Sequence, residues 1–101
     1  MGLDIELQDE RGERLQSTGD AQNLLIRLLP DDADAYPMLA SIDPYGDTVF
    51  NRIQMGRFLR EWEAVSANAR SADERILVGI VQSMAVHCRD EVHLYLKFIG
   101  D

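Results

Sequence analysis

The first residues of the chain alternate between apolar and polar side chains. Leu3, Ile5 and Leu7 are each separated by one acidic residue, and a period of two is typical of a strand with one buried face. The polar residues that follow include Gly12, which can adopt a positive φ in a turn. Residues 14–17 can return as a short second strand. The opening of the chain therefore predicts a β-hairpin.

The pattern between this hairpin and residue 43 is less regular. Asp20 can cap a short helix that ends before Pro30, although the apolar run at 24–29 is also typical of a buried strand. Both interpretations stay open at this level. Residues 31–34 are predicted to form a solvated loop, and residues 36–42 a short strand.

The segment 51–69 repeats apolar residues at helical spacing. Asn51 followed by Gln54 resembles a capping box, although Asp47 or Thr48 could be the true cap. Polar and basic side chains occupy the remaining circumference, so we expect an amphipathic surface helix. The predicted apolar face consists of Met55, Phe58, Leu59, Trp62, Val65 and Ala69.

A second helix is predicted over residues 73–89. It begins at a capping box formed by Ser71 and Glu74. The short connection 66–72 should make the two helices antiparallel neighbours. Apolar residues cover more than half of its circumference, so we expect it to be the most buried helix. They are Ile76, Leu77, Val78, Ile80, Val81, Met84, Ala85 and Cys88.

The end of the chain, 92–99, again alternates between apolar and polar residues and predicts a strand that belongs to the core. The first strand would present Asp4 and Glu6 outward, and the last would present His93 and Lys97. Pairing these two strands would set opposite charges against each other across the sheet. We therefore predict that they are neighbours.

These elements together predict an α+β fold. The expected architecture is a small, mostly antiparallel sheet, made of the N-terminal hairpin and the C-terminal strand, packed against an antiparallel helical hairpin. With 101 residues, 46% of them hydrophobic and 28% charged, the chain has the size and composition of one ordinary globular domain. We assign residues 1–101 to that single domain.

The charge balance restricts the partners that the chain could bind. Eighteen acidic residues against ten basic ones give a formal charge of −8, which disfavours direct binding to nucleic acid or to anionic membranes. The lone Cys88 and the absence of a signal-peptide pattern at residues 1–6 predict a cytoplasmic protein. Nine of the ten basic residues are Arg, which favours a GC-rich bacterial genome.

Acidic residues gather in the segment between Arg27 and Arg52, where no Lys or Arg occurs. Asp is common in loops, turns and caps, and residues 43–46 match the preferences of a type I turn, so these residues could simply terminate elements. The alternative is a surface that binds a basic partner. The candidate binding residues are Asp31, Asp32, Asp34, Asp43, Tyr45 and Asp47.

The sequence offers little support for catalysis or metal binding. The spacing from Asp43 to Gly46 does not match an EF-hand loop. His87 and Cys88 are consecutive and would point about 100° apart on a helix, so we expect Cys88 to be inert packing and His87 a hydrogen-bonded core residue. Phosphate-binding, metalloprotease and nucleophile-elbow motifs are absent. We predict no enzymatic activity and no cofactor.

The leading hypothesis is a small protein-binding module of the inhibitor, immunity-protein or antitoxin kind, which docks a basic protein partner through its acidic loop. A homo-oligomeric structural or regulatory protein that associates through the helical hairpin is the second hypothesis. The third is a metal-dependent enzyme that uses Asp43, Asp47 and His87.

Overall fold

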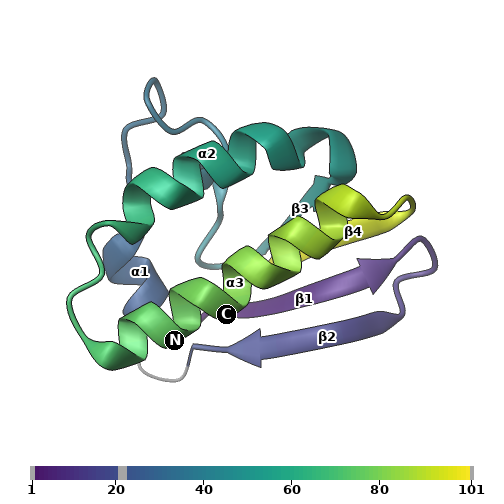
Figure 1. Ribbon diagram of the computed structural model, residues 1–101, viewed down its shortest axis with the longest axis horizontal. Coiled ribbons are helices and arrows are strands. Elements are labelled where there is room, and N and C mark those ends of the chain that lie inside the picture. The colour runs from purple at the N-terminus through teal and green to yellow at the C-terminus, as the bar shows by residue number, and fades with distance from the viewer. Residues whose placement is uncertain (1, 21–22, 101) are drawn as a thin grey trace.

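The structure, a computed structural model, describes residues 2–20 and 23–100. Its sheet has the order β2-β1-β4-β3, and every neighbouring pair is antiparallel. The helices α2 and α3 run antiparallel over one face of this sheet (Figure 1). The predicted α+β fold is thus confirmed. The elements are β1 (Asp4–Asp9), β2 (Arg14–Gly19), α1 (Leu24–Leu28), the 3-10 helix η1 (Leu39–Ser41), β3 (Asp47–Asn51), the 3-10 helix η2 (Arg52–Gln54), α2 (Met55–Ser66), α3 (Ala72–Asp90) and β4 (Leu94–Ile99).

The N-terminal hairpin forms as predicted. Gly12 adopts a φ of 81° and its N–H donates to the carbonyl of Asp9 at 3.0 Å. The Asp9 carboxylate accepts from the backbone N–H groups of Arg11 and Glu13 at 2.8 and 2.9 Å, which closes the turn. A bulge between Leu7 and the next residue then shifts the register of β1 against β2.

The predicted pairing of the first and last strands is confirmed, and β4 lies between β1 and β3. Glu6 lies directly opposite Lys97. Their charged groups nevertheless have other neighbours: Lys97 Nζ lies 3.5 Å from Asp47 on β3, and Glu6 lies 3.7 Å from Arg14 on β2. The outer face of the sheet therefore carries charge pairs across all four strands.

The last strand begins two residues later than predicted. His93 adopts a φ of 66°, which is incompatible with extended backbone, and its Nδ1 lies 3.2 Å from Glu10 in the hairpin turn. As a result Val92 belongs to the connection before β4 and is exposed, whereas Leu94, Leu96 and Phe98 are buried.

The predicted strand at 36–42 is wrong, because this segment forms turns and η1. Its backbone N–H groups bond within the segment, from Ala40 to Tyr36 and from Ser41 to Met38. The sequence interpretation also missed β3. In that edge strand Phe50 is the one fully buried position, so the alternation of apolar and polar residues was too weak to detect.

The two predicted capping boxes both form. Asn51 and Gln54 exchange side-chain-to-backbone bonds, so Asn51 is the cap instead of Asp47 or Thr48. Ser71 and Glu74 do the same before α3. The first box opens η2, which continues into α2, and the helix ends at Ser66.

Within the segment 20–29, Leu24–Leu28 form the helix α1 instead of a strand. Asp20 is buried, and its carboxylate accepts from the N–H groups of Leu24 and Leu25 at 2.7 Å. It therefore supplies capping hydrogen bonds as predicted, although the residue at the N-cap position is Asn23. Residues 21–22 of this segment lie outside the described residues.

An aromatic cluster fills the space between the helices and the sheet. Phe58 lies 5.4 Å from Phe50, 5.9 Å from Phe98 and 5.7 Å from Trp62, measured between ring centroids. The indole N–H of Trp62 donates to the carbonyl of Val78 at 3.1 Å, so α2 is tied to α3 within the core. Trp62 and Phe58 are core residues, as predicted.

The helix α3 is less covered than predicted. Ile76 is 62% exposed and Ile80 40% exposed, although both belong to the predicted apolar arc. They lie toward β2, whose inward-facing side chains include Thr18 and Gln16, and these polar residues provide little apolar cover. His87 is not a core residue either, since its side chain is 42% exposed and its Nε2 lies 3.2 Å from Glu91.

None of the described helices is long and apolar enough to cross a membrane.

Candidate functional site

The acidic loop before η1 is organised by one of its own carboxylates. Asp32 Oδ1 accepts from the backbone N–H groups of Asp34 at 3.1 Å and of Ala35 at 3.2 Å. Asp31 and Asp34 are exposed on either side of it. Asp32 thus has a structural role in the loop in addition to its charge.

The second half of the acidic segment is the turn at residues 43–46. Asp43 Oδ1 accepts from the N–H of Tyr45 at 2.9 Å, and the N–H of Gly46 approaches the Asp43 carbonyl at 3.4 Å. Thr48 Oγ1 accepts from the N–H of Asp43 at 2.9 Å, and the N–H of Gly100 donates to the Gly46 carbonyl at 2.7 Å. The predicted turn is therefore present and is anchored at both ends, and it presents an exposed Tyr45.

Asp47 has a different setting from the other candidate residues. It is the first residue of β3, and its Oδ2 lies 3.5 Å from Lys97 Nζ on β4. Both side chains retain solvent contact, so the pair adds little to stability. It does partly neutralise this end of the acidic segment.

The loop and the turn share one apolar hollow of about 290 Å³. Asp31 lies at the rim on the side of the loop and Pro44 on the side of the turn. The fold therefore brings the two halves of the acidic segment to one place, although η1 separates them along the chain. The remaining lining residues are apolar: Ile26, Leu29, Pro30, Leu39, Ala40 and Ile42.

Glu61 on α2 holds this region in place, and the sequence interpretation did not identify it. Its buried carboxylate accepts from the N–H of Leu39 at 3.0 Å and from the N–H of Met38 at 3.1 and 3.3 Å. It also accepts from Arg57 Nε at 3.1 Å, one helical turn earlier. Glu61 gives no distinctive sequence signal for two reasons. The helix α2 carries several other charged residues, and the backbone N–H groups that Glu61 binds are 22 and 23 residues away.

The groups suggested for metal binding or catalysis are not assembled. Among the described residues no three His, Cys, Asp or Glu side chains form a group that could hold a metal ion, so Asp43, Asp47 and His87 do not make such a site. Cys88 is buried, as predicted, and its Sγ lies 3.5 Å from the Leu94 carbonyl. Burial raises the pKa of the Cys88 thiol to about 11, which suppresses the nucleophilic thiolate at neutral pH.

Comparison with known protein families, with curated proteins and with solved structures finds no match to this chain. Its function must therefore be inferred from the geometry and the chemistry of its own surfaces.

Proposed function

We propose that the chain is a protein-binding module of the inhibitor, immunity-protein or antitoxin kind, which docks a basic protein partner in the cytoplasm. The observation that carries this proposal is the apolar hollow with Asp31 on one rim and the 43–46 turn on the other. Such a surface offers an apolar floor with the Asp31 carboxylate among its lining residues, and the other carboxylates of the acidic segment lie in the adjoining loop and turn. A reduced, buried Cys88 is compatible with the cytoplasm.

The chemistry of this surface suits Arg or Lys side chains together with apolar ones. Arg and Lys can lay an aliphatic stem along apolar surface and keep the charged head among carboxylates. Tyr45 is 69% exposed beside the hollow, and tyrosine is enriched among the residues that dominate binding energy at interfaces. We therefore expect a basic side chain of the partner to enter the hollow and its neighbours to contact Tyr45.

The charge of the segment favours rapid encounter with such a partner. Between Arg27 and Arg52 the chain has five Asp residues and no Lys or Arg, a local formal charge of −5. Clustered charge of one sign attracts a partner of the opposite sign before contact and raises the association rate. The same charge repels the phosphates of nucleic acids.

A comparison of proteins captured from native lysate tests this proposal. The test variant carries Asp31→Asn, Asp32→Asn and Asp34→Asn. Asn keeps an acceptor oxygen at each position, so the loop bonds at Asp32 can persist while the charge is lost. The matched control removes three exposed carboxylates elsewhere, through Glu10→Gln, Glu13→Gln and Glu63→Gln.

The proposal predicts that a basic protein is captured by the wild type and by the control, and that its recovery falls about tenfold with the test variant. Quantitative mass spectrometry supplies the measurement. Equal recovery with both triple variants would show that the acidic loop is not the binding surface.

A further inference from the structure

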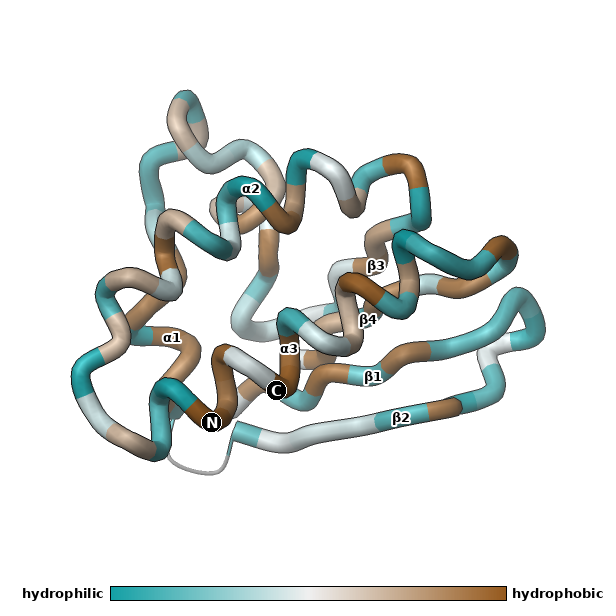
Figure 2. The backbone as a smooth tube through the Cα atoms, in the orientation of Figure 1, coloured by the Kyte–Doolittle hydropathy of each residue, from teal (hydrophilic) through white to brown (hydrophobic). Residues whose placement is uncertain are grey.

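The outer edge of β2 is open in the described part of the chain. β2 is the terminal strand of the sheet, and its residues from Leu15 to Gly19 are all uncharged. Exposed edge strands commonly carry Lys, Pro, inward-pointing charges or a β-bulge that prevent pairing with another chain. From Leu15 to Gly19, β2 has only the bulge beside Leu15, and Leu15 is 49% exposed. The hydropathy colouring shows that β2 is mostly polar to neutral along its length (Figure 2).

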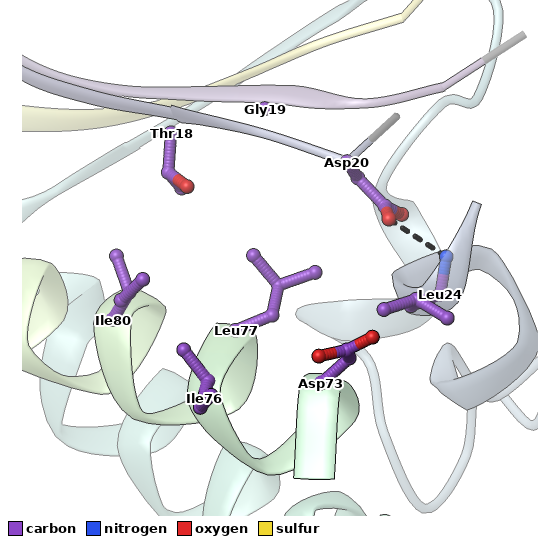
Figure 3. A pocket seen from close by; sticks show the side chains of 8 residues that line it. All are labelled: Thr18, Gly19, Asp20, Leu24, Asp73, Ile76, Leu77 and Ile80. Atoms are coloured by element: carbon purple, nitrogen blue, oxygen red, sulfur yellow. Dashed lines mark hydrogen bonds between the residues drawn. The ribbon is translucent and has the colours of Figure 1, made fainter. Parts of the chain in front are cut away.

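A groove of about 310 Å³ lies beside this edge, between β2 and the first half of α3. Thr18 projects from the strand toward Ile76, Leu77 and Ile80 of the helix (Figure 3). Ile76 and Ile80 are the exposed isoleucines of α3. The groove and the open edge therefore form one continuous surface that is partly apolar and offers unpaired backbone.

The hydrogen-bond pattern of the hairpin shows which backbone groups are available at the edge. The N–H of Asp9 donates to the Glu13 carbonyl at 3.0 Å, so Asp9 directs its backbone toward β2. In an antiparallel ladder this direction alternates from residue to residue. Thr18, opposite Ile5, then faces β1, whereas Ser17 and Gly19 direct their N–H and C=O groups to the open edge.

We propose that this surface binds a second copy of the chain. The two β2 strands pair antiparallel about a two-fold axis, with Ser17 opposite Ser17 of the second copy, so that two four-stranded sheets become one continuous sheet. This register places Leu15 of each copy close to Gly19 of the other. The proposed dimer goes beyond the proposed function, because its interface uses neither the acidic segment nor the hollow.

Charge complementarity between Arg14 on β2 and Asp4 on β1 favours a second copy as the occupant. The antiparallel register brings Arg14 of one copy close to Gly19 of the other, and Gly19 pairs with Asp4 on β1. Gly19 has no side chain to obstruct the approach: a Cβ there would lie 3.1 Å from Asp4 Oδ1. Arg14 is largely exposed and lies 3.7 Å from Glu6 within its own chain. In the two-fold dimer, Arg14 of each copy would thus pair with Asp4 of the other copy.

The area of a standard interface and the length of the β2 edge set the scale of the proposed dimer contact. A standard interface takes roughly 800 Å² from each partner, about one seventh of the 5817 Å² that this molecule exposes. The strand supplies about 20 Å of edge at about 3.4 Å per residue. The groove and the neighbouring face of α3 extend this contact.

Analytical ultracentrifugation across the micromolar range tests the proposal on the full chain. A reversible dimer is expected, and Leu15→Glu and Ile80→Asp should each raise its dissociation constant at least about tenfold. Both positions are partly exposed, so the fold should persist, as far-UV circular dichroism would verify. The matched control is Val49→Glu on the other edge strand, at a site that is 51% exposed; it should leave the dimer unchanged.

An exchange of the charges at positions 14 and 4 tests the register of the two paired β2 strands. Arg14→Glu and Asp4→Arg should each weaken the dimer, and the double variant should restore it to within a few-fold of the wild type. A chain that stays monomeric at all concentrations would overturn the proposal. A dimer weakened equally by Val49→Glu, or a double variant weaker than either single one, would overturn it as well.

Discussion

At the scale of single residues, Glu61 has a structural role that the sequence did not reveal. It links α2 to the segment before η1 through Met38 and Leu39. Leu39 also lines the apolar hollow. Removing this carboxylate therefore affects both stability and the shape of the candidate site.

We predict that Glu61→Ala lowers the free energy of unfolding by about 1–3 kcal/mol, because two N–H groups and Arg57 lose their acceptor. Urea denaturation provides the measurement. Glu61→Gln, which keeps an acceptor oxygen, should cost less than Glu61→Ala. The exposed neighbour Glu63 is the control, and Glu63→Ala should be close to neutral. Equal losses from Glu61→Ala and Glu63→Ala would contradict the assigned role.

Cys88 provides a second prediction at this scale. Burial raises its pKa from 9.0 to about 11, so the folded state favours the neutral thiol more than the unfolded state does. The resulting stabilisation is complete below pH 9 and is lost as the pH rises through 11. A polar thiol reagent should therefore modify the native protein far more slowly than the urea-unfolded protein at pH 8. Similar rates in the two states would show that the thiol is accessible.

At the scale of elements, the sequence predicted those parts whose signal is local. The two capping boxes, the Gly12 turn and the alternation in β1 and β4 each depend on residues a few positions apart, and each was identified. η1 and β3 were not identified, because each depends on a contact with a distant part of the chain. η1 has local backbone hydrogen bonds but is held in place by the Glu61 side chain, and β3 forms by pairing with β4.

The candidate site was likewise predicted only in its local features. The acidic residues and the turn at 43–46 were visible in the sequence, but the apolar hollow that joins them was not. It requires α1 and the 39–42 segment to meet. The exposure of Ile76 and Ile80 was likewise unpredictable from helical periodicity, since periodicity does not show where the sheet ends.

The strand β4 should be essential for folding. It pairs with both β1 and β3, and it buries Leu94, Leu96 and Phe98. Each of these side chains contributes about 1.5–3 kcal/mol of burial, against a typical total stability of about 5–15 kcal/mol. Deletion of residues 92–101 should therefore prevent folding. Val92→Ala, at an exposed position in the preceding connection, is the control and should melt like the wild type. A cooperative thermal transition in the truncated chain would refute this prediction.

At the scale of the whole molecule, the proposals concern two different surfaces. The acidic segment contributes Asp31 and Pro44 to a hollow beside α1 and η1, whereas the open edge of β2 lies beside the groove between β2 and α3. A two-fold pair of chains would leave the acidic segments outside the strand pairing. Self-association and the binding of a basic partner are then independent properties, and loss of one should not abolish the other.

The most direct test of the central claim is the association rate of the captured partner with the wild type and the triple Asn variant, measured across salt concentrations. Attraction by clustered charge fades as the Debye length falls from about 30 Å at 0.01 M to about 8 Å at 0.15 M salt. The wild type should therefore associate faster at low salt and show the steeper salt dependence. The variant with Glu10→Gln, Glu13→Gln and Glu63→Gln has lost the same charge elsewhere and should stay closer to the wild type. Identical rates and slopes for the wild type and the triple Asn variant would contradict the claim that the acidic segment is the binding surface.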